Sequence, residues 1–204
     1  QFHLFGGEER TIDMMHRQDK IPYASLGDIA AISLQFDIKG VEMMIILPRE
    51  RTPEALKQTA IKYLSTHGLK SINDKLSKHR KVLALPKFKA QYKSSLKDVL
   101  KDVGLNRSFS DDAEFPRIAK QHLKISDVIH EAVLKVDEHG AEASAATSVV
   151  MNRMMGSINK PEQEIYFTVD RPFLVAIYDK QTNLPIFTGA ISEVGAYEKA
   201  GEEL

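Results

Sequence analysis

Short apolar runs separated by turn-forming residues dominate the hydrophobic pattern of this chain. The runs 29–36 and 41–47 are rich in Ile, Leu, Ala and Met; Gly40 lies between them, and Pro48 follows the second. Runs of this length and composition with such boundaries predict strands, here two adjacent strands joined by a tight turn. The same reasoning predicts strands at 81–85, 125–136, 173–178 and 184–191.

Helical patterns occupy segments between these runs. Thr52, a capping residue, is followed by Pro53, so we expect a helix to begin there and to end near Gly68. A second short helix is expected over 70–77. Residues 94–104 place apolar side chains on one helical face and finish with glycine, which predicts an amphipathic helix and its end. This mixture of strands and helices indicates an α+β fold.

Composition narrows the class of protein. With 204 residues, of which 43% are apolar and 27% charged, the chain is expected to fold into one or two globular domains. No apolar stretch approaches the roughly 18 residues of a membrane-spanning helix, so no membrane association is expected. The sequence contains no cysteine, which excludes disulfide bonds and thiolate zinc sites.

Charge is balanced overall and uneven along the chain. The 28 basic and 28 acidic side chains cancel, yet residues 62–101 carry 11 basic and only 2 acidic ones. This basic segment predicts either a solvated face or a site for a polyanion such as heparin. The side chains that we assign to a possible polyanion site are Lys75, Lys78, Arg80 and Lys81. No aromatic-rich RNA-binding signature accompanies them, and no nucleic-acid partner is expected.

The motifs of common enzymes fail to match. His130 and Glu131 begin a zinc-protease motif, but Leu134 stands where the second histidine belongs. The sequence contains no nucleophile elbow, no phosphate-binding loop and no dinucleotide fingerprint. We therefore expect no enzymatic activity, no metal and no cofactor.

Residues 140–152 form a segment of small and hydroxylated residues ahead of two strongly apolar strands. With a strand period of two, one face of this segment carries no charge. Its members are Ala141, Ala143, Ala145, Thr147, Val149 and Met151. Gly140 and the small side chains also suit an exposed loop. The segment is therefore able to exist either as a loop or as a strand in a sheet, and a plain Ala/Ser linker is the simpler alternative.

Several blocks of the sequence resemble one known family, in the family's order. Residues 137–147 (DEHGAEASAAT) resemble the hinge of the reactive-centre loop of serpins, the serine protease inhibitors. Residues 167–178 and 184–189 are similar to the family's C-terminal signature, and 124–130 and 85–88 match further blocks. The resemblance implies the C-terminal half of the α+β serpin fold. That half contributes strands to three β-sheets plus a few helices, and the N-terminal half is absent.

The resemblance also implies an organisation and a mechanism. The whole chain, 1–204, would be part of one serpin domain, with the reactive-centre loop at 138–160, its hinge at 138–147 and a flexible tail at 195–204. The hinge residues are Glu138, Gly140, Ala141, Glu142, Ala143, Ser144, Ala145, Ala146 and Thr147. A target serine protease would cleave the loop and form an acyl-enzyme, and the freed hinge would insert into the central sheet and trap it.

The reactive bond follows from the family's register. Counting from Gly140 places it between Met154 and Met155. A methionine there favours a chymotrypsin-like or elastase-like target, because such pockets accept a long, flexible apolar side chain. The bond between Arg153 and Met154 is the alternative and favours a trypsin-like target.

Further positions carry over from the resemblance or stand as isolated signals. Glu138 and Lys87 match a charge pair at the top of the serpin sheet, and His130 matches a histidine that hydrogen-bonds across the opening strands. Asn106 and Ser108 belong to a glycosylation sequon, which is consistent with an extracellular, secreted protein; an intracellular serpin is the alternative.

The function predicted from the resemblance is inhibition of a serine protease by covalent trapping. Its partners are the target protease and the remaining N-terminal half of the serpin, with heparin or another glycosaminoglycan as a possible third. Two alternatives remain open, a non-inhibitory serpin that acts as a carrier or chaperone, and a serpin whose main role is polyanion binding.

Overall fold

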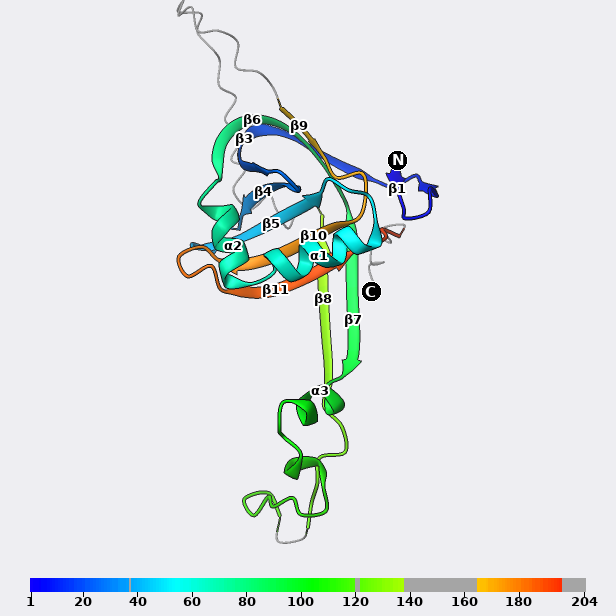
Figure 1. Cartoon of the computed structure of the whole chain (residues 1–204), viewed down its shortest axis with the longest axis vertical. Coiled ribbons are helices and arrows are strands. Elements are labelled where there is room, and N and C mark those ends of the chain that lie inside the picture. The colour runs from blue at the N-terminus through cyan, green and yellow to red at the C-terminus, as the bar shows by residue number, and fades with distance from the viewer. Residues whose placement is uncertain (37, 120–121, 138–164, 196–204) are drawn as a thin grey trace, which may run out of the picture. The chain divides into compact units, whose positions relative to one another are not determined.

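The computed structural model describes residues 1–36, 38–119, 122–137 and 165–195, without the side chains of residues 79–81. These residues form two compact units. The first, here called the sheet unit, comprises Gln1–Lys89 and Lys135–Leu204, and the second, the hairpin unit, comprises Ala90–Leu134. Figure 1 shows the elements of both units.

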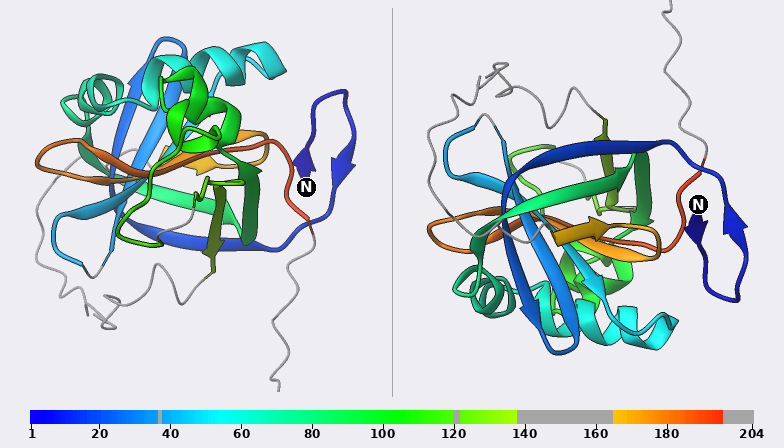
Figure 2. Two further views of the ribbon diagram at one scale, coloured as in Figure 1. Left: turned by 90° about the horizontal axis from the view of Figure 1, so that it is seen from below. Right: turned by 90° about the horizontal axis from the view of Figure 1, so that it is seen from above.

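A seven-stranded sheet with the order β11-β10-β5-β4-β3-β6-β9 forms the sheet unit. Its strands are β3 (Met14–Leu26), β4 (Ile29–Gln35), β5 (Val41–Pro48), β6 (Ser77–Pro86), β9 (Ile165–Thr168), β10 (Phe173–Asp179) and β11 (Pro185–Ile191). The helices α1 (Pro53–Tyr63) and α2 (Thr66–Asn73) pack on one face (Figure 2), and β1 (Phe2–His3) pairs with β2 (Glu9–Arg10) in a small separate hairpin.

The strands predicted at 29–36, 41–47, 173–178 and 184–191 are confirmed, whereas the strand predicted over 125–136 begins only at Ile129. β4 and β5 pair antiparallel with Ile32 opposite Ile45, and β10 pairs with β5 on one side and β11 on the other, with Val175 opposite Ile45. All three of these side chains are fully buried. On the opposite face, β4, β5 and β10 contribute to the core that lies against α1 and α2. Because both faces of these strands are buried, consecutive residues are apolar, and the sequence shows no alternation of apolar and polar residues.

The start of α1 is confirmed, but the predicted boundary between the two helices is wrong. The Thr52 side chain accepts a hydrogen bond from the Ala55 N–H at 3.1 Å, and Pro53 is the first helical residue. The helix ends at Tyr63, and Ser65 caps α2 by accepting from the Gly68 N–H at 3.1 Å. Gly68 therefore lies within the second helix. A Cβ there would lie 2.4 Å from a backbone oxygen of α1, so the glycine permits close helix packing.

The longest strand was not predicted. β3 spans 13 residues, and its middle is the polar sequence HRQDK. It pairs with β6 from Met14 to Tyr23 and with β4 from Tyr23 to Leu26, so it passes from one partner to the other. The strand predicted at 81–85 covers only part of β6, which begins at Ser77. Backbone pairing with neighbours, not an apolar pattern, defines these polar strand segments.

The hairpin unit departs more from the predictions. Its two-stranded sheet pairs β7 (Phe88–Ser95) with β8 (Ile129–Val136), and α3 (Lys97–Asp102) and a one-turn 3₁₀ helix, η1 (Arg107–Phe109), lie between them. The helix predicted over 94–104 is shorter at both ends. Ser95 is extended and bonds to Asp127, and the Leu96 N–H donates to the Val128 carbonyl at 2.8 Å. Strand pairing thus continues where the helix was expected.

Candidate functional site

The predicted reactive-centre loop, including its hinge and the Met154–Met155 and Arg153–Met154 bonds, lies outside the described residues. The structure describes the strands on either side of it. β8 ends at Val136 before the loop, and β9 begins at Ile165 after it. The two strands belong to different sheets, so the intervening segment connects separate sheets.

The strand that precedes the loop is anchored at its end. Leu134 and Val136 are buried, at 9% and 4% exposure. Lys135 and Asp137 form an ion pair at 3.6 Å, in which Asp137 is the less exposed partner. The last described residues before the predicted hinge are therefore held by both apolar and charged contacts.

The strand that follows the loop is anchored on one face only. β9 runs parallel to β6, with Lys81 opposite Ile165 and Ala84 opposite Thr168. Phe167 is buried and meets the ring of Tyr23 edge-on, at 6.2 Å between centroids. The neighbouring Tyr166 points to the other face.

The structure places the two residues assigned to structural switching in different settings. Lys87 follows β6 and is half-buried, and its N–H donates to the Asp13 carbonyl at 3.0 Å. Its predicted partner, Glu138, lies outside the described residues, so the charge pair stays a prediction. His130 is exposed on β8, and none of the described residues hydrogen-bonds to its imidazole. Its role across the opening strands also stays a prediction.

The possible polyanion and glycosylation residues lie at the surface where their side chains are described. Lys75 and Lys78 are exposed, and Arg80 and Lys81 belong to β6, paired with β3. Asn106 is exposed and immediately precedes η1, without a side-chain capping bond. Lys75, Lys78 and Asn106 are therefore accessible, and the proposed roles of all five residues stay predictions.

Sequence reasoning missed a buried polar cluster around Glu42. This carboxylate is 2% exposed and accepts hydrogen bonds from Ser33 Oγ at 2.5 Å and from the Tyr178 hydroxyl at 3.1 Å. Lys180 Nζ pairs with it as well, and Gln35 Nε2 donates at 3.4 Å. The sequence did contain a signal for this cluster, because Glu42 is a single acidic residue within the apolar run 41–47.

The cluster keeps Glu42 ionised. Burial opposes the charge, but hydrogen bonds from Lys180 and Ser33 outweigh it and lower the pKa of the Glu42 carboxyl below its ordinary value. Burial, together with the Glu42 charge, raises the pKa of the Tyr178 phenol, which stays a hydrogen-bond donor. The cluster joins β4, β5 and β10 at one end of the sheet, which is a structural role.

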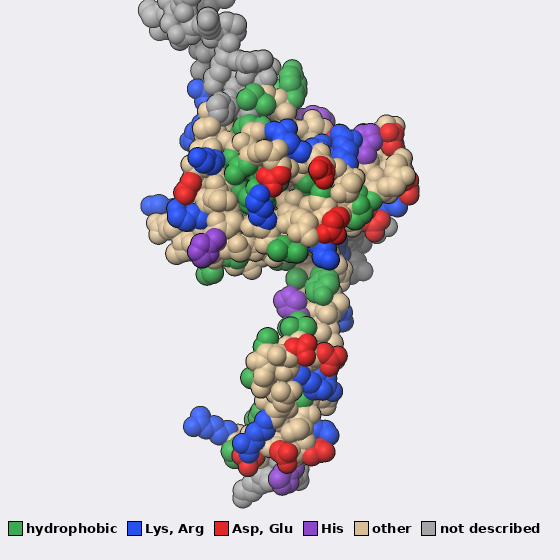
Figure 3. All heavy atoms as spheres, viewed as in Figure 1, with side chains coloured by type: hydrophobic (Ala, Val, Ile, Leu, Met, Phe, Trp, Pro, Cys, Tyr) green, Lys and Arg blue, Asp and Glu red, His purple; other side chains and the backbone are tan. Residues whose placement is uncertain are grey.

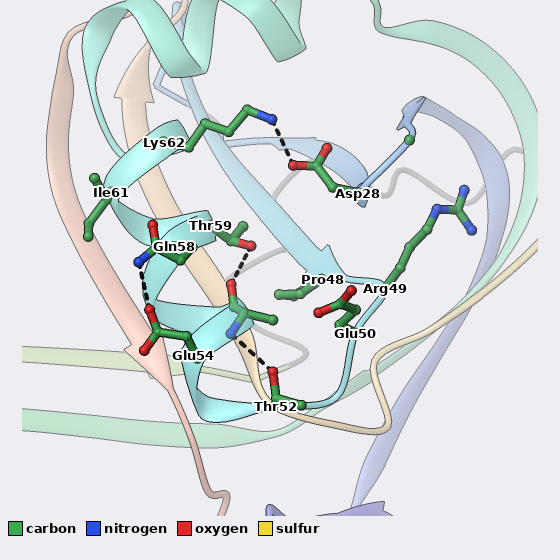
Figure 4. A pocket seen from close by; sticks show the side chains of 12 residues that line it. Asp28, Pro48, Arg49, Glu50, Thr52, Glu54, Gln58, Thr59, Ile61 and Lys62 are labelled. Carbon is green, nitrogen blue, oxygen red and sulfur yellow. Dashed lines mark hydrogen bonds and ion pairs between the residues drawn. The ribbon is translucent and has the colours of Figure 1, made fainter.

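An open pocket of about 610 Å³ lies beside the first turns of α1 (Figure 4). Its charged groups are largely engaged by neighbours. Lys62 Nζ lies 2.8 Å from an Asp28 oxygen, and Gln58 donates to Glu54 at 2.6 Å. The lining comes from α1, the β3–β4 turn, the end of β5 and the segment after it, and none of β6, β8 or β9 contributes. The pocket is thus separate from the strands that flank the predicted loop.

Metal clusters and membrane-spanning helices are both absent from the described residues. No group of three or more His, Asp or Glu side chains there could hold a metal ion. Among the described helices, none has the length and apolar character needed to span a bilayer.

The α+β arrangement, in which consecutive strands β8 and β9 belong to different sheets, defines a class of protein that comparison with known proteins identifies. Residues 1–194 match the family model for serpins, described as serine protease inhibitors. The chain belongs to the serpin family, a family of protease inhibitors. The earlier expectation of a C-terminal serpin part with an α+β fold is confirmed.

Individual relatives agree with this assignment. An uncharacterized serpin-like protein of Thermococcus kodakarensis is 34% identical over 179 residues, which cover 87% of this chain and 40% of the relative. Iripin-3 of Ixodes ricinus is 33% identical over 194 residues, covering 93% and 47%. The solved structure of a cleaved serpin, Serpin 42Da, has a TM-score of 0.71 at 26% identity and covers 95% of this chain and 50% of that one. The chain thus spans about half the length of its relatives.

Proposed function

We propose that the protein containing this chain inhibits a serine protease as a suicide substrate. One observation carries the proposal: the segment that follows β8 alternates small, uncharged residues at Ala141, Ala143 and Ala145. Such a segment can leave a loop and enter a sheet with one face buried. β8 provides the strand from which it continues.

The chemistry begins as ordinary proteolysis. The protease serine Oγ attacks the carbonyl carbon of Met154, and the bond to the Met155 nitrogen breaks. The serine proton passes through the protease's general base to the leaving amine, and an acyl-enzyme ester remains on Met154. Insertion of the hinge as a strand then competes with hydrolysis of this ester. Backbone hydrogen bonds and apolar burial gained by the new strand drive the insertion.

The hinge side chains control this competition. A large or charged side chain at Ala141 opposes entry into the sheet, because it must be desolvated and accommodated between packed side chains. Ala141→Arg is therefore expected to convert the inhibitor into a substrate that is cleaved and released. Glu142→Arg, on the opposite face of the alternation, is the matched control and retains most of the covalent complex. Undiminished complex with Ala141→Arg would contradict hinge insertion.

The central experiment uses the complete protein with a chymotrypsin-like and a trypsin-like protease. A complex that survives SDS supports covalent trapping, and sequencing of the released peptide locates the reactive bond. A peptide that begins at Met155 supports the first assignment, and one that begins at Met154 supports cleavage after Arg153. Turnover without complex would favour a non-inhibitory carrier or chaperone.

The surface lysines suggest an accessory partner, and the sequon suggests a location. Lys75 and Lys78 are exposed, as a site for heparin or another polyanion requires. Salt-sensitive retention on heparin that falls when both residues become Glu would support it. The exposed Asn106 is consistent with glycosylation in a secreted protein, which a glycosidase-sensitive shift in mass would test.

A further inference from the structure

The strands β3, β6 and β9 share a face that the predicted function leaves unused. The pairing register places Tyr166 beside Val82, and Val82 beside Gln18. The next rows on the same face contain Thr168, His16, Lys20 and Lys78. We call this surface the β9 face; Figure 2, right, shows its three strands side by side. Phe167 and Leu83 occupy the opposite face and are buried, so the β9 face points away from the core.

Exposure and charge distinguish this face. Tyr166 is 70% exposed, so most of its aromatic ring is in contact with solvent. Lys20, Lys78 and His16 are exposed as well, and no Asp or Glu occupies a position of this face within the paired segments of β3, β6 and β9. Lys, Arg and His side chains are visible along the upper rim in Figure 3. An exposed aromatic ring is typical of a protein-binding surface, and the neighbouring cations favour an acidic partner. Asp19, on the opposite face of β3, interacts electrostatically with Lys78 and offsets part of this charge.

We infer that the β9 face is a secondary contact surface for the target serine protease, which would present a negatively charged area beside its active-site cleft. This inference rests on the proposed function. Because the face lies outside the cleaved segment, it would add affinity and selectivity without taking part in the acyl transfer.

The short chain segment between the predicted reactive bond and Tyr166 keeps a bound protease near this face. Ten residues separate Met155 from Tyr166, so the reactive bond lies at most about 40 Å from the tyrosine along an extended chain. A compact domain of about 200 residues has a radius of gyration of about 16 Å, and so a diameter of about 40 Å. A protease bound at Met154 is therefore tethered within reach of β9, at a high effective concentration.

The two kinds of side chain should act on different steps. Tyr166 offers a large, rigid contact that can be desolvated in the centre of an interface, as energetically dominant residues are. Lys20 and Lys78 lie on strands farther from the loop end and would attract an acidic partner during encounter, an effect that salt screens. Both contributions precede cleavage, so they change the rate of complex formation and leave the fraction of protease trapped unchanged.

The test measures the association rate constant of the complete protein with the protease that it inhibits. Tyr166→Ala is expected to lower this constant about tenfold. The double variant Lys20→Glu/Lys78→Glu is expected to lower it several-fold at low salt and hardly at all at 1 M salt. In both variants the stoichiometry of inhibition should match that of the parent protein.

Matched controls come from exposed positions elsewhere in the sheet unit. Ile61→Ala removes an apolar side chain of similar exposure, 66%, from α1, and Lys57→Glu/Lys89→Glu makes the same change in net charge. Both controls should keep the parent rate to within a factor of two. All the altered residues are exposed, so thermal unfolding should confirm that each variant folds.

The outcomes separate this inference from the proposed function. If the parent protein forms no covalent complex with any serine protease, the proposed function fails and this inference fails with it. If the complex forms but Tyr166→Ala and the lysine variant associate as fast as their controls, only the contact surface is refuted. Should Lys20→Glu/Lys78→Glu lose heparin retention while its association with the protease is unchanged, the face binds a polyanion instead, which also overturns the inference.

Discussion

The sheet unit and the hairpin unit differ in how completely they bury their apolar side chains. In the sheet unit, β4, β5 and β10 bury apolar side chains on both faces, and Ile32, Ile45 and Val175 are fully enclosed. The hairpin unit has only two paired strands and a helix without a buried residue. Of the thirteen large apolar side chains exposed among the described residues, eight belong to its 45 residues. A unit of that size cannot enclose a core by itself.

This contrast indicates where stability comes from. The sheet unit can be expected to hold its own fold, because its core is closed by α1, α2 and curved neighbouring strands. The hairpin unit depends on surfaces outside its own residues, in line with relatives that are about twice as long as this chain. It also contains most of β8, the strand whose last residues, in the sheet unit, precede the predicted hinge.

The largest expected loss of stability comes from truncating a side chain in a strand that is buried on both faces. Ile45→Ala removes a fully buried side chain and should lower the free energy of unfolding by about 2–5 kcal/mol. Ile129→Ala, at 56% exposure in β8, should change it by less than about 0.5 kcal/mol in this chain. Urea titration of both variants measures the difference. Equal effects would remove the distinction between the units.

A second prediction concerns the buried acid. Glu42→Gln should lower the free energy of unfolding at pH 7 by about 1–2 kcal/mol, because Lys180 loses its partner while the amide retains bonds to Ser33 and Tyr178. Gln35→Ala, which removes a longer bond to the same carboxylate, is a milder companion variant.

The pH dependence of that effect has a definite sign. The pKa of Glu42 is lower in the folded chain than in the unfolded one, so its contribution is complete above the ordinary value of 4.5. It disappears as the pH falls through the folded pKa, where both states bind the proton. Unfolding curves from pH 7 to pH 3 should therefore converge for parent and Glu42→Gln. A gap that widens toward acid would show the assignment to be wrong.

Helix packing gives a third test. Gly68→Ala places a methyl group where an ideal Cβ lies 2.4 Å from the Lys62 carbonyl oxygen, so α2 must shift from α1 at a cost of about 1–3 kcal/mol. Gly27→Ala meets no atom within 4 Å and is the control. Thermal unfolding of the two variants should separate them, and comparable melting temperatures would refute the close approach.

The smallest effect expected is at a helix cap. Thr52→Ala removes the bond to the Ala55 N–H and should cost about 1 kcal/mol. Thr52→Ser keeps the hydroxyl and should restore nearly all of it, as chemical denaturation can measure. In the hairpin unit, Leu96 precedes α3 without a side-chain cap, so Leu96→Ala should cause no comparable loss.

Local signals predicted much of the fold. The apolar runs at 29–36, 41–47, 173–178 and 184–191 correspond to strands, and the Thr52–Pro53 pair correctly marked the start of α1. The candidate site was also accessible from sequence, since the alternation after Gly140 and the family blocks depend on the order of residues alone. These features are encoded within a few residues of each other, so no long-range contact is needed to recognise them.

Only the tertiary structure decided the rest. The polar middle of β3 is a strand because β6 pairs with its backbone, and Gly68 belongs inside α2 because another helix approaches it. Glu42 meets Tyr178 across 136 positions of sequence, and Tyr166 joins Gln18 on one face through β6. Residues far apart in the chain acquire such roles when backbone pairing and burial bring them together, and no pattern within a short window encodes that meeting.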